Sequence, residues 1–221
     1  MQSLKNLYWL AFVLVLIPSQ VGAQDNSQPK PQTFVIGRTG IFTEGGGTTY
    51  RFVETFQVRG RWVFPDLGYI DFGKSDYKEL FVGAGATLVS SKHLTLIEEG
   101  YFVQAVGSTS GDARYFQPWT YIGWNIAPKL GGEAVYFPYL PLNKAGRIQH
   151  VLERAKMEYD FKHWKLGAGY AAYQFGDGEW QNKPFITTTL KAGKLGNLEI
   201  WLQKMPTKTA QVQVRYAKVF R

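Results

Sequence analysis

The sequence predicts a single closed antiparallel β-barrel of about twelve strands, within a range of ten to twelve, that crosses a membrane. First, apolar and polar residues alternate with a period of two along most of the chain. Alternation over segments of about ten residues is typical of strands whose two faces meet lipid and a polar lumen. Second, short turns and longer loops alternate between these segments. Third, no apolar stretch reaches the roughly 20 residues that a transmembrane helix needs.

The composition indicates a folded chain and excludes several classes of protein. Of the 221 residues, 45% are hydrophobic and 16% are aromatic, which is too apolar for an intrinsically disordered protein. The absence of cysteine excludes a disulfide scaffold, a zinc finger and a cysteine nucleophile. The net charge of +8 permits nucleic acids, anionic lipids or acidic ligands as partners without choosing among them.

Residues 1–23 are predicted to be a signal peptide. Lys5 precedes an unbroken apolar run from Leu7 to Ile17, and Val21-Gly22-Ala23 supplies the small residues of a cleavage site. That run is too short to span a bilayer as a helix, and an uncleaved anchor is the alternative. Residues 24–32 are polar and contain proline, so we expect a periplasmic lead-in before a barrel over 33–221. Export argues against nucleic acid as a partner.

The stretch 50–64 shows the alternation most clearly. Apolar and aromatic residues such as Phe52 and Phe56 hold its even positions, and Arg51 and Arg59 hold odd ones. Because successive side chains on a strand point to opposite faces, we expect the apolar face to contact lipid and the basic face to line the lumen. A helix over 147–156 is an alternative for one later segment. The predicted strands are 33–42, 50–64, 68–74, 78–90, 93–106, 115–126, 130–140, 149–161, 164–175, 185–194, 198–205 and 210–220.

The connections between these strands form two sets. With both chain termini on one side of the membrane, every short turn falls on that side and every longer loop on the other, as in membrane barrels. Aromatic residues collect where the strands meet the short turns, which predicts anchoring at a membrane interface. The predicted short turns are 65–67, 91–92, 127–129, 162–163 and 195–197, and the interface aromatics are Trp62, Phe64, Trp124, Phe161, Trp164 and Phe220.

The last strand alternates and closes on an aromatic residue, Phe220, within the run QVQVRYAKVF at 211–220. In this strand, and in the alternation over 33–221, the chain resembles bacterial outer-membrane β-barrels as a class. Arg221 departs from the class, whose members usually end on the aromatic residue. The resemblance implies a bacterial outer-membrane location, outer-membrane lipid as surroundings, and recognition by the barrel-assembly machinery. Twelve-stranded members of the class include small oligosaccharide channels with basic lumens and a phospholipase.

A soluble exported barrel of the lipocalin type is the alternative fold. It would place the apolar face inside and the basic face outside. Eight strands already enclose a space that side chains or one ligand can fill, so the larger number of longer strands argues against this alternative.

A basic stripe on the expected inner face suggests the function. It would attract and steer anions, which predicts a small channel for anionic or polar solutes. The alternative is a closed barrel with a structural or surface-interaction role, in which inner acids pair with the basic residues and fill the lumen. The predicted lumen-lining and solute-binding residues are Arg51, Arg59, Arg61, Glu99, Arg154, Lys156 and Arg215, and the acids proposed as partners are Glu79, Glu99, Glu158, Asp160 and Glu199.

An outer-membrane hydrolase is the second alternative. It would use His150 with Glu153 or Asp112, and with Ser108 or Ser110 as the nucleophile, but no nucleophile motif surrounds either serine. We therefore predict no catalytic residues, no metal site and no cofactor. Glu98 falls on the expected lipid face, which is costly for a carboxylate, so a bulge or register shift is expected near it.

Overall fold

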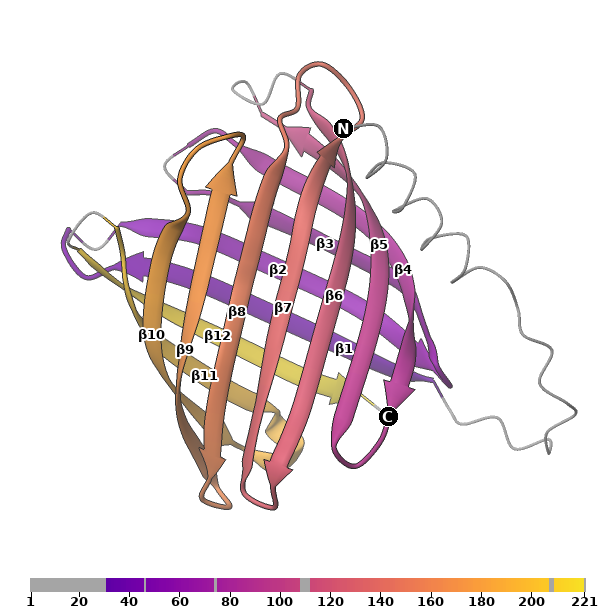
Figure 1. The fold of residues 1–221 in the computed structure, drawn as a ribbon, viewed down its shortest axis with the longest axis vertical. Helices are drawn as coiled ribbons and strands as arrows, with labels where there is room; N and C mark the ends of the chain where they lie inside the picture. The colour runs from indigo at the N-terminus through magenta and orange to yellow at the C-terminus, as the bar shows by residue number, and fades with distance from the viewer. Residues whose placement is uncertain (1–30, 46, 74, 108–111, 207–208, 221) are drawn as a thin grey trace, which may run out of the picture.

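In a computed structural model, residues 31–45, 47–73, 75–107, 112–206 and 209–220 are described, and they form one closed barrel (Figure 1). The predicted signal peptide and residues 24–30 of the lead-in lie outside the described residues. The strands are β1 (Gln32–Phe42), β2 (Thr48–Arg59), β3 (Trp62–Asp71), β4 (Lys78–Ser90), β5 (Leu94–Val106), β6 (Arg114–Ala127), β7 (Leu130–Pro141), β8 (Gln149–Asp160), β9 (Trp164–Phe175), β10 (Gln181–Lys191), β11 (Asn197–Lys204) and β12 (Ala210–Phe220).

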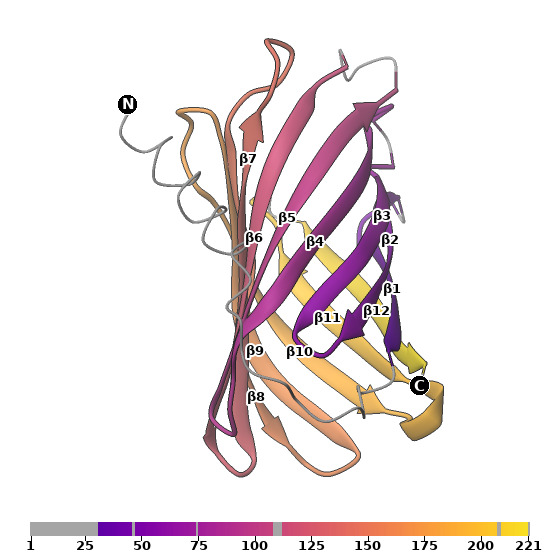
Figure 2. The same ribbon diagram turned by 90° about the vertical axis from the view of Figure 1, so that its right-hand side faces the viewer.

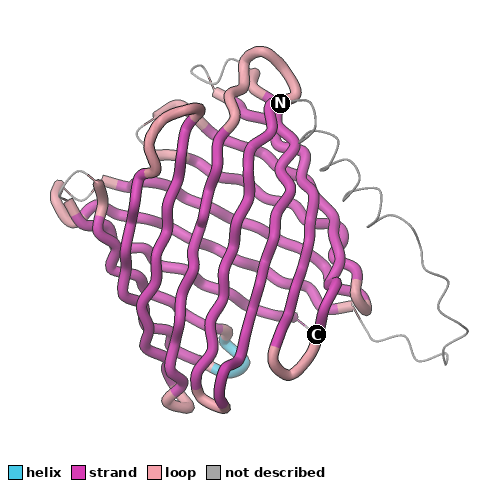
Figure 3. Tube along the Cα trace, in the orientation of Figure 1, coloured by secondary structure: helices cyan, strands magenta, loops and turns pink. Residues whose placement is uncertain are grey.

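The sheet closes on itself, as predicted. Each strand pairs antiparallel with its neighbours in sequence, and β1 pairs with β12 over ten residue pairs from Thr33↔Phe220 to Phe42↔Gln211. Figures 2 and 3 show the strands tilted around one barrel, with front and back walls crossing. Closure leaves no strand edge unpaired, which is what a sheet surrounded by lipid requires. The helical content of the described residues is one three-residue turn, Gly193–Leu195, too short to cross a membrane.

The two ends of the barrel differ in their connections, as predicted. The turns after β2, β4, β6, β8 and β10 gather at one end, which we call the short-turn end. The loops after β1, β3, β5, β7, β9 and β11 gather at the other, which we call the long-loop end. The segment 147–156, for which a helix was the alternative, enters strand β8.

The first hairpin corrects one predicted strand. The stretch 50–64 is not continuous: β2 ends at Arg59, Gly60 turns with a φ of +59°, and β3 begins at Trp62. Glycine adopts this left-handed conformation at little cost, so the chain reverses there. The predicted turn at 65–67 lies instead within β3.

Pro65 is tolerated inside β3 because the pairing is irregular there. The register between β3 and β4 shifts between Val63 and Asp66, on either side of the proline. A proline lacks the N–H that a regular ladder needs, and a bulge is one of the few strand positions that accept it. The expected register shift near Glu98 is also present, because the β4–β5 pairing shifts between Thr87 and Val89.

Candidate functional site: the barrel interior

The interior near the long-loop end is filled by an aromatic cluster. Tyr101, Tyr115 and Tyr139 are buried there with Val103, and the Tyr115 and Tyr139 rings meet edge to face with centroids 5.2 Å apart. Gly83 lies opposite Tyr101, and a side chain at that position would collide with the tyrosine ring. The glycine therefore makes room for a large side chain that crosses the lumen.

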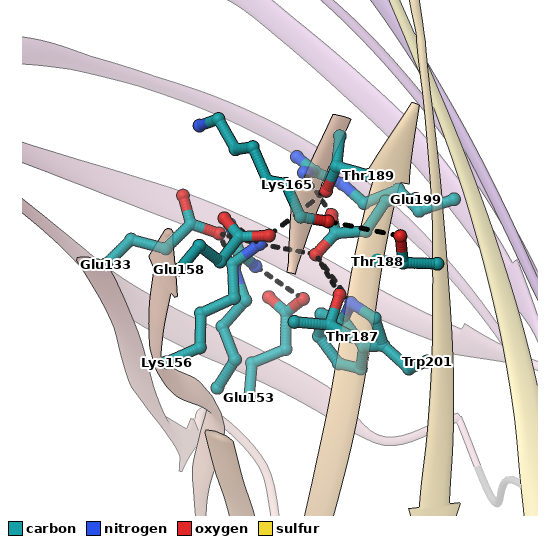
Figure 4. Close-up of polar contacts among 12 residues, drawn as sticks. Glu133, Glu153, Lys156, Glu158, Lys165, Thr187, Thr188, Thr189, Glu199 and Trp201 are labelled. Atoms are coloured by element: carbon teal, nitrogen blue, oxygen red, sulfur yellow. Dashed lines mark hydrogen bonds and ion pairs between the residues drawn. The ribbon is translucent and has the colours of Figure 1, made fainter. Parts of the chain in front are cut away.

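The middle of the barrel contains eight charged side chains joined by ion pairs, which we call the ion-pair network. Arg154 Nε lies 2.5 Å from Glu133 Oε1, and Lys156 Nζ lies 3.1 Å from Glu158 Oε2. Lys156 also pairs with Glu199 (Figure 4), whose Oε2 lies 3.3 Å from Arg215 Nη1. The members are Arg38, Glu133, Glu153, Arg154, Lys156, Glu158, Glu199 and Arg215.

The ion-pair network joins walls of the barrel that are far apart in the sheet. Arg38 of β1 pairs with Glu153 of β8, although four strands separate β1 from β8 along the shorter way around the sheet. Lys156 of β8 pairs with Glu199 of β11. Four cations meet four carboxylates, so the network is formally neutral. It therefore links opposite walls of the barrel without leaving a net charge of its own.

A β-bulge turns Glu153 into this network. In β8 the register shifts against β7 between Val135 and Tyr136, and against β9 between Leu152 and Ala155. A bulge adds one residue to a strand and lets two neighbours point to the same side. Glu153 and Arg154 therefore both reach the interior, where Arg154 Nη1 lies 2.7 Å from Glu153 Oε1.

Four neighbouring strands each bear one inner carboxylate outside the network, and we call these four the carboxylate wall. Tyr101 Oη lies 2.9 Å from Asp66 Oδ2 and 2.7 Å from Glu99 Oε2, so it can donate its hydrogen to either. Glu79 accepts hydrogen bonds from Tyr77 at 2.8 Å and Tyr139 at 2.9 Å. The members are Glu54 on β2, Asp66 on β3, Glu79 on β4 and Glu99 on β5.

The interior is more open near the short-turn end. A cavity of about 210 Å³ and a second of about 160 Å³ both reach Glu133, Glu158 and Lys165. Small residues such as Gly123 and Gly131 form part of the wall of the larger cavity, which explains the space. The smaller cavity extends to Lys156, Glu199 and Arg215, so these hollows lead from the short turns to the ion-pair network.

Four of the seven predicted lumen-lining residues face the interior. Arg154 and Lys156 are 3% and 4% exposed and belong to the ion-pair network with Arg215. Glu99 is buried in the carboxylate wall. Arg154, Lys156 and Arg215 each form an ion pair with an inner carboxylate, as predicted for the alternative of a closed barrel with a filled lumen.

The other three, Arg51, Arg59 and Arg61, lie on the outside of the barrel, which corrects their prediction. In β2 the even face points inward: the Phe52 ring centroid lies 5.8 Å from the Arg38 guanidinium, inside the barrel. Arg51 and Arg59 therefore point outward and are exposed. Arg61 follows in the turn, with its guanidinium 4.7 Å from the centroid of the Trp62 ring.

One residue in the sequence indicates which face of β2 points inward. Glu54 lies in the middle of the aromatic face, where a lipid-facing carboxylate would be costly. That single residue indicates that the aromatic face looks inward. Arg38, Glu133 and Glu153 were also missed, the last because a bulge breaks the period-two rule.

The predicted interface aromatics gather around the short-turn end. Phe64 and Phe220 are exposed, and Phe161 stacks on Trp164 with ring centroids 4.3 Å apart. Trp62 and Trp124 lie in the same zone, at the start of β3 and near the end of β6.

The described residues that a hydrolase would use do not come together. His150 Nδ1 lies 2.7 Å from the Tyr136 hydroxyl, and its ring lies beside that of Trp180. Glu153 instead turns inward to Arg38. Ser108 and Ser110 lie outside the described residues. Among the residues that are described, no group of three histidine or acidic side chains is arranged to hold a metal ion.

Solved porin structures share this fold. The structure titled "KdgM porin" matches with a TM-score of 0.61 at 12% identity, covering 85% of this chain and 99% of that one. A second, titled "KdgM porin in complex with disordered oligogalacturonate", gives a TM-score of 0.63 at 12% identity with the same coverage. A NanC porin structure gives 0.57 at 9% identity, covering 84% and 98%. No known family model and no curated protein sequence matches this chain. The chain thus has the closed twelve-stranded barrel of outer-membrane porins.

Proposed function

We propose that the protein is a narrow channel for small polar solutes in the bacterial outer membrane. The observation that carries this proposal is the charged and hollow interior: two cavities lead from the short-turn end to the ion-pair network. A barrel that served only as a solid membrane anchor would gain more from an apolar filling, because burying charges is costly even when they are paired. The charged lining instead suits water and polar solutes.

The surroundings proposed for the barrel follow from its outer surface. Apolar side chains such as Leu80, Ile186 and Leu202 are exposed on it, and the aromatic residues near the short turns would anchor it at the interface with lipid. On this assignment the short-turn end faces the periplasm. The terminal strand β12, which closes the barrel against β1, is the segment that the assembly machinery would recognise.

The expected preference for anions is not part of this proposal. One of the similar structures is titled a complex with oligogalacturonate, which supports passage of polar oligosaccharides through this type of barrel. In the present chain, however, Arg51 and Arg59 lie outside, and the four cations of the ion-pair network are matched by four carboxylates.

The test is the conductance of the full chain, expressed with its own leader in a Gram-negative host and placed in a planar bilayer. We expect a small, stable conductance for the native protein. Replacing Arg38 and Glu153 together by serine removes one cross-lumen pair while keeping the network neutral, so the conductance should rise severalfold. Arg59→Ser, on the outer surface, is the matched control and should leave it unchanged.

A closed barrel is the second candidate, favoured by the ion-pair network and by the aromatic cluster near the long loops. The same experiment separates the two. If both the native protein and the double variant show the gel mobility shift of a folded barrel on heating but conduct no ions, the channel is contradicted and the closed barrel is supported.

A further inference from the structure

The unmatched charges inside the barrel are concentrated in the carboxylate wall. Within the described ranges, no ion pair includes any of its four members. The ion-pair network is neutral, and near the short turns Lys191 is matched by Asp160. Two inner lysines, Lys165 and Lys183, have no carboxylate within ion-pair distance in the described part of the chain, and Lys183 Nζ instead lies 4.0 Å from the centroid of the Tyr173 ring. Among the described residues, the inner surface thus has four carboxylates and two lysines without an ion-pair partner.

One oxygen of this wall is left without any partner. Asp66 is 1% exposed, and its Oδ2 lies within hydrogen-bond distance of the Tyr101 hydroxyl. Its Oδ1 is buried and has no hydrogen-bond partner among the described residues. A buried polar atom without a partner is unfavourable, so Asp66 lacks the compensation that the carboxylates of the ion-pair network receive from their cations.

Glu54 lies between the other members of the carboxylate wall and the ion-pair network. Asp66 and Glu99 interact electrostatically with Glu54 from its own side, and Glu153 and Arg215 do so from the ion-pair network. Arg215 is already paired with Glu199. Glu54 accepts no side-chain hydrogen bond within the part of the chain that the structure describes, and it is only partly buried. It is therefore the member best placed to meet a passing ion.

We propose that the carboxylate wall makes the lumen select for cations, so that inorganic cations and small ammonium-bearing solutes pass in preference to anions. This inference rests on the proposed channel. A single unpaired charge about 6 Å from an ion's path, in a water-like dielectric, changes the local ion concentration by about threefold. The carboxylates of the wall lie on four neighbouring strands, so their effects add, whereas the neutral network contributes little at a distance.

The test is the reversal potential of the full chain in a planar bilayer under a potassium chloride gradient at pH 8. The native protein should pass potassium in preference to chloride. Glu99→Gln should lower the potassium-to-chloride permeability ratio by about tenfold, because one charge near the path raises the local potassium concentration and lowers the chloride concentration by about threefold each. Glu98→Gln is the matched control, because the neighbouring Glu98 lies on the opposite, outer face and accepts a hydrogen bond from Thr120.

The outcomes separate the two proposals. Absence of any conductance contradicts the channel itself. Conductance that is unselective or favours chloride overturns the carboxylate wall as the selectivity element while the channel stands. Equal changes for Glu98→Gln and Glu99→Gln overturn it as well.

A second variant keeps the inference testable if Glu99→Gln does not fold. The chain contains no cysteine, so Glu54→Cys provides a unique thiol. A negatively charged thiosulfonate reagent should restore the potassium preference of this variant, and a positively charged one should reverse it. No effect of either reagent on the reversal potential would show that residue 54 does not face the ion path.

Discussion

The ion-pair network and the carboxylate wall share one lumen but treat their charges differently. In the network, Lys156 and Arg154 each contact more than one carboxylate, so removing either cation takes a partner from several carboxylates at once. In the carboxylate wall, Asp66 and Glu99 share only the hydroxyl of Tyr101. The first arrangement fixes the distance between walls of the barrel. In the second, no cation from the described residues balances the carboxylates.

This difference predicts that the network contributes to stability and the carboxylate wall to selectivity. Breaking a buried ion pair by removing one partner is strongly destabilising, because the remaining charge stays desolvated. Removing one of several mutually repelling carboxylates carries no such penalty. Substitutions in the two regions should therefore change different measured properties.

The largest expected effect is that of Lys156→Met. Lys156 is 4% exposed and pairs with Glu133, Glu158 and Glu199, which would lose their shared cation. We expect the free energy of unfolding in urea, measured in lipid vesicles, to fall by about 3–5 kcal/mol. Lys204→Met, on the exposed outer side of β11, is the control and should change it by less than about 0.5 kcal/mol. A similar stability for both variants would contradict the structural role of the network.

A smaller and more direct comparison uses the same substitution in both regions. Glu199 contacts Lys156, Arg215 and the Trp201 indole, so Glu199→Gln loses hydrogen bonds to charged groups and should cost about 1.5–3 kcal/mol. Glu99→Gln loses no cation and relieves repulsion from Asp66. Its unfolding free energy should stay within about 1 kcal/mol of the native value. A larger loss of stability for Glu99→Gln than for Glu199→Gln would mean that the carboxylate wall, and not the ion-pair network, stabilises the barrel.

Much of the fold could be predicted from the sequence. Successive side chains on a strand point to opposite faces, and lipid on one face and a polar lumen on the other then require apolar and polar residues to alternate. Strand β11 alternates cleanly, and the ends of β4 and β11 fall within one residue of the predicted ones. The first hairpin was misplaced because both Gly60 and Pro65 are turn-forming residues. The structure uses the glycine for the turn and accommodates the proline at an irregular register.

The interior was less predictable, since it depends on bulges and on contacts between distant strands. Period two places Glu153 opposite Arg154, but the bulge in β8 brings both inside. Arg38 and Glu153 are separated by more than one hundred residues, and nothing local links them. Part of the charged lining, such as Arg154, Lys156 and Glu99, was foreseen, whereas the charge balance of the lumen required knowing which face of β2 points inward.

The smallest expected effect tests that face of β2. Arg51 lies on the outer side, opposite Thr39 of β1 and Asp71 of β3, and makes no ion pair with any described residue. Arg51→Gln should leave the reversal potential unchanged and alter the unfolding free energy by less than about 0.5 kcal/mol, as is usual at the surface. If Arg51 lined the lumen, as the alternation alone suggested, removing its positive charge would instead shift the reversal potential toward greater potassium preference. A shift of that sign would mean that the basic face of β2 lines the lumen. The lumen would then have an excess of positive charge, and the carboxylate wall could not set its selectivity.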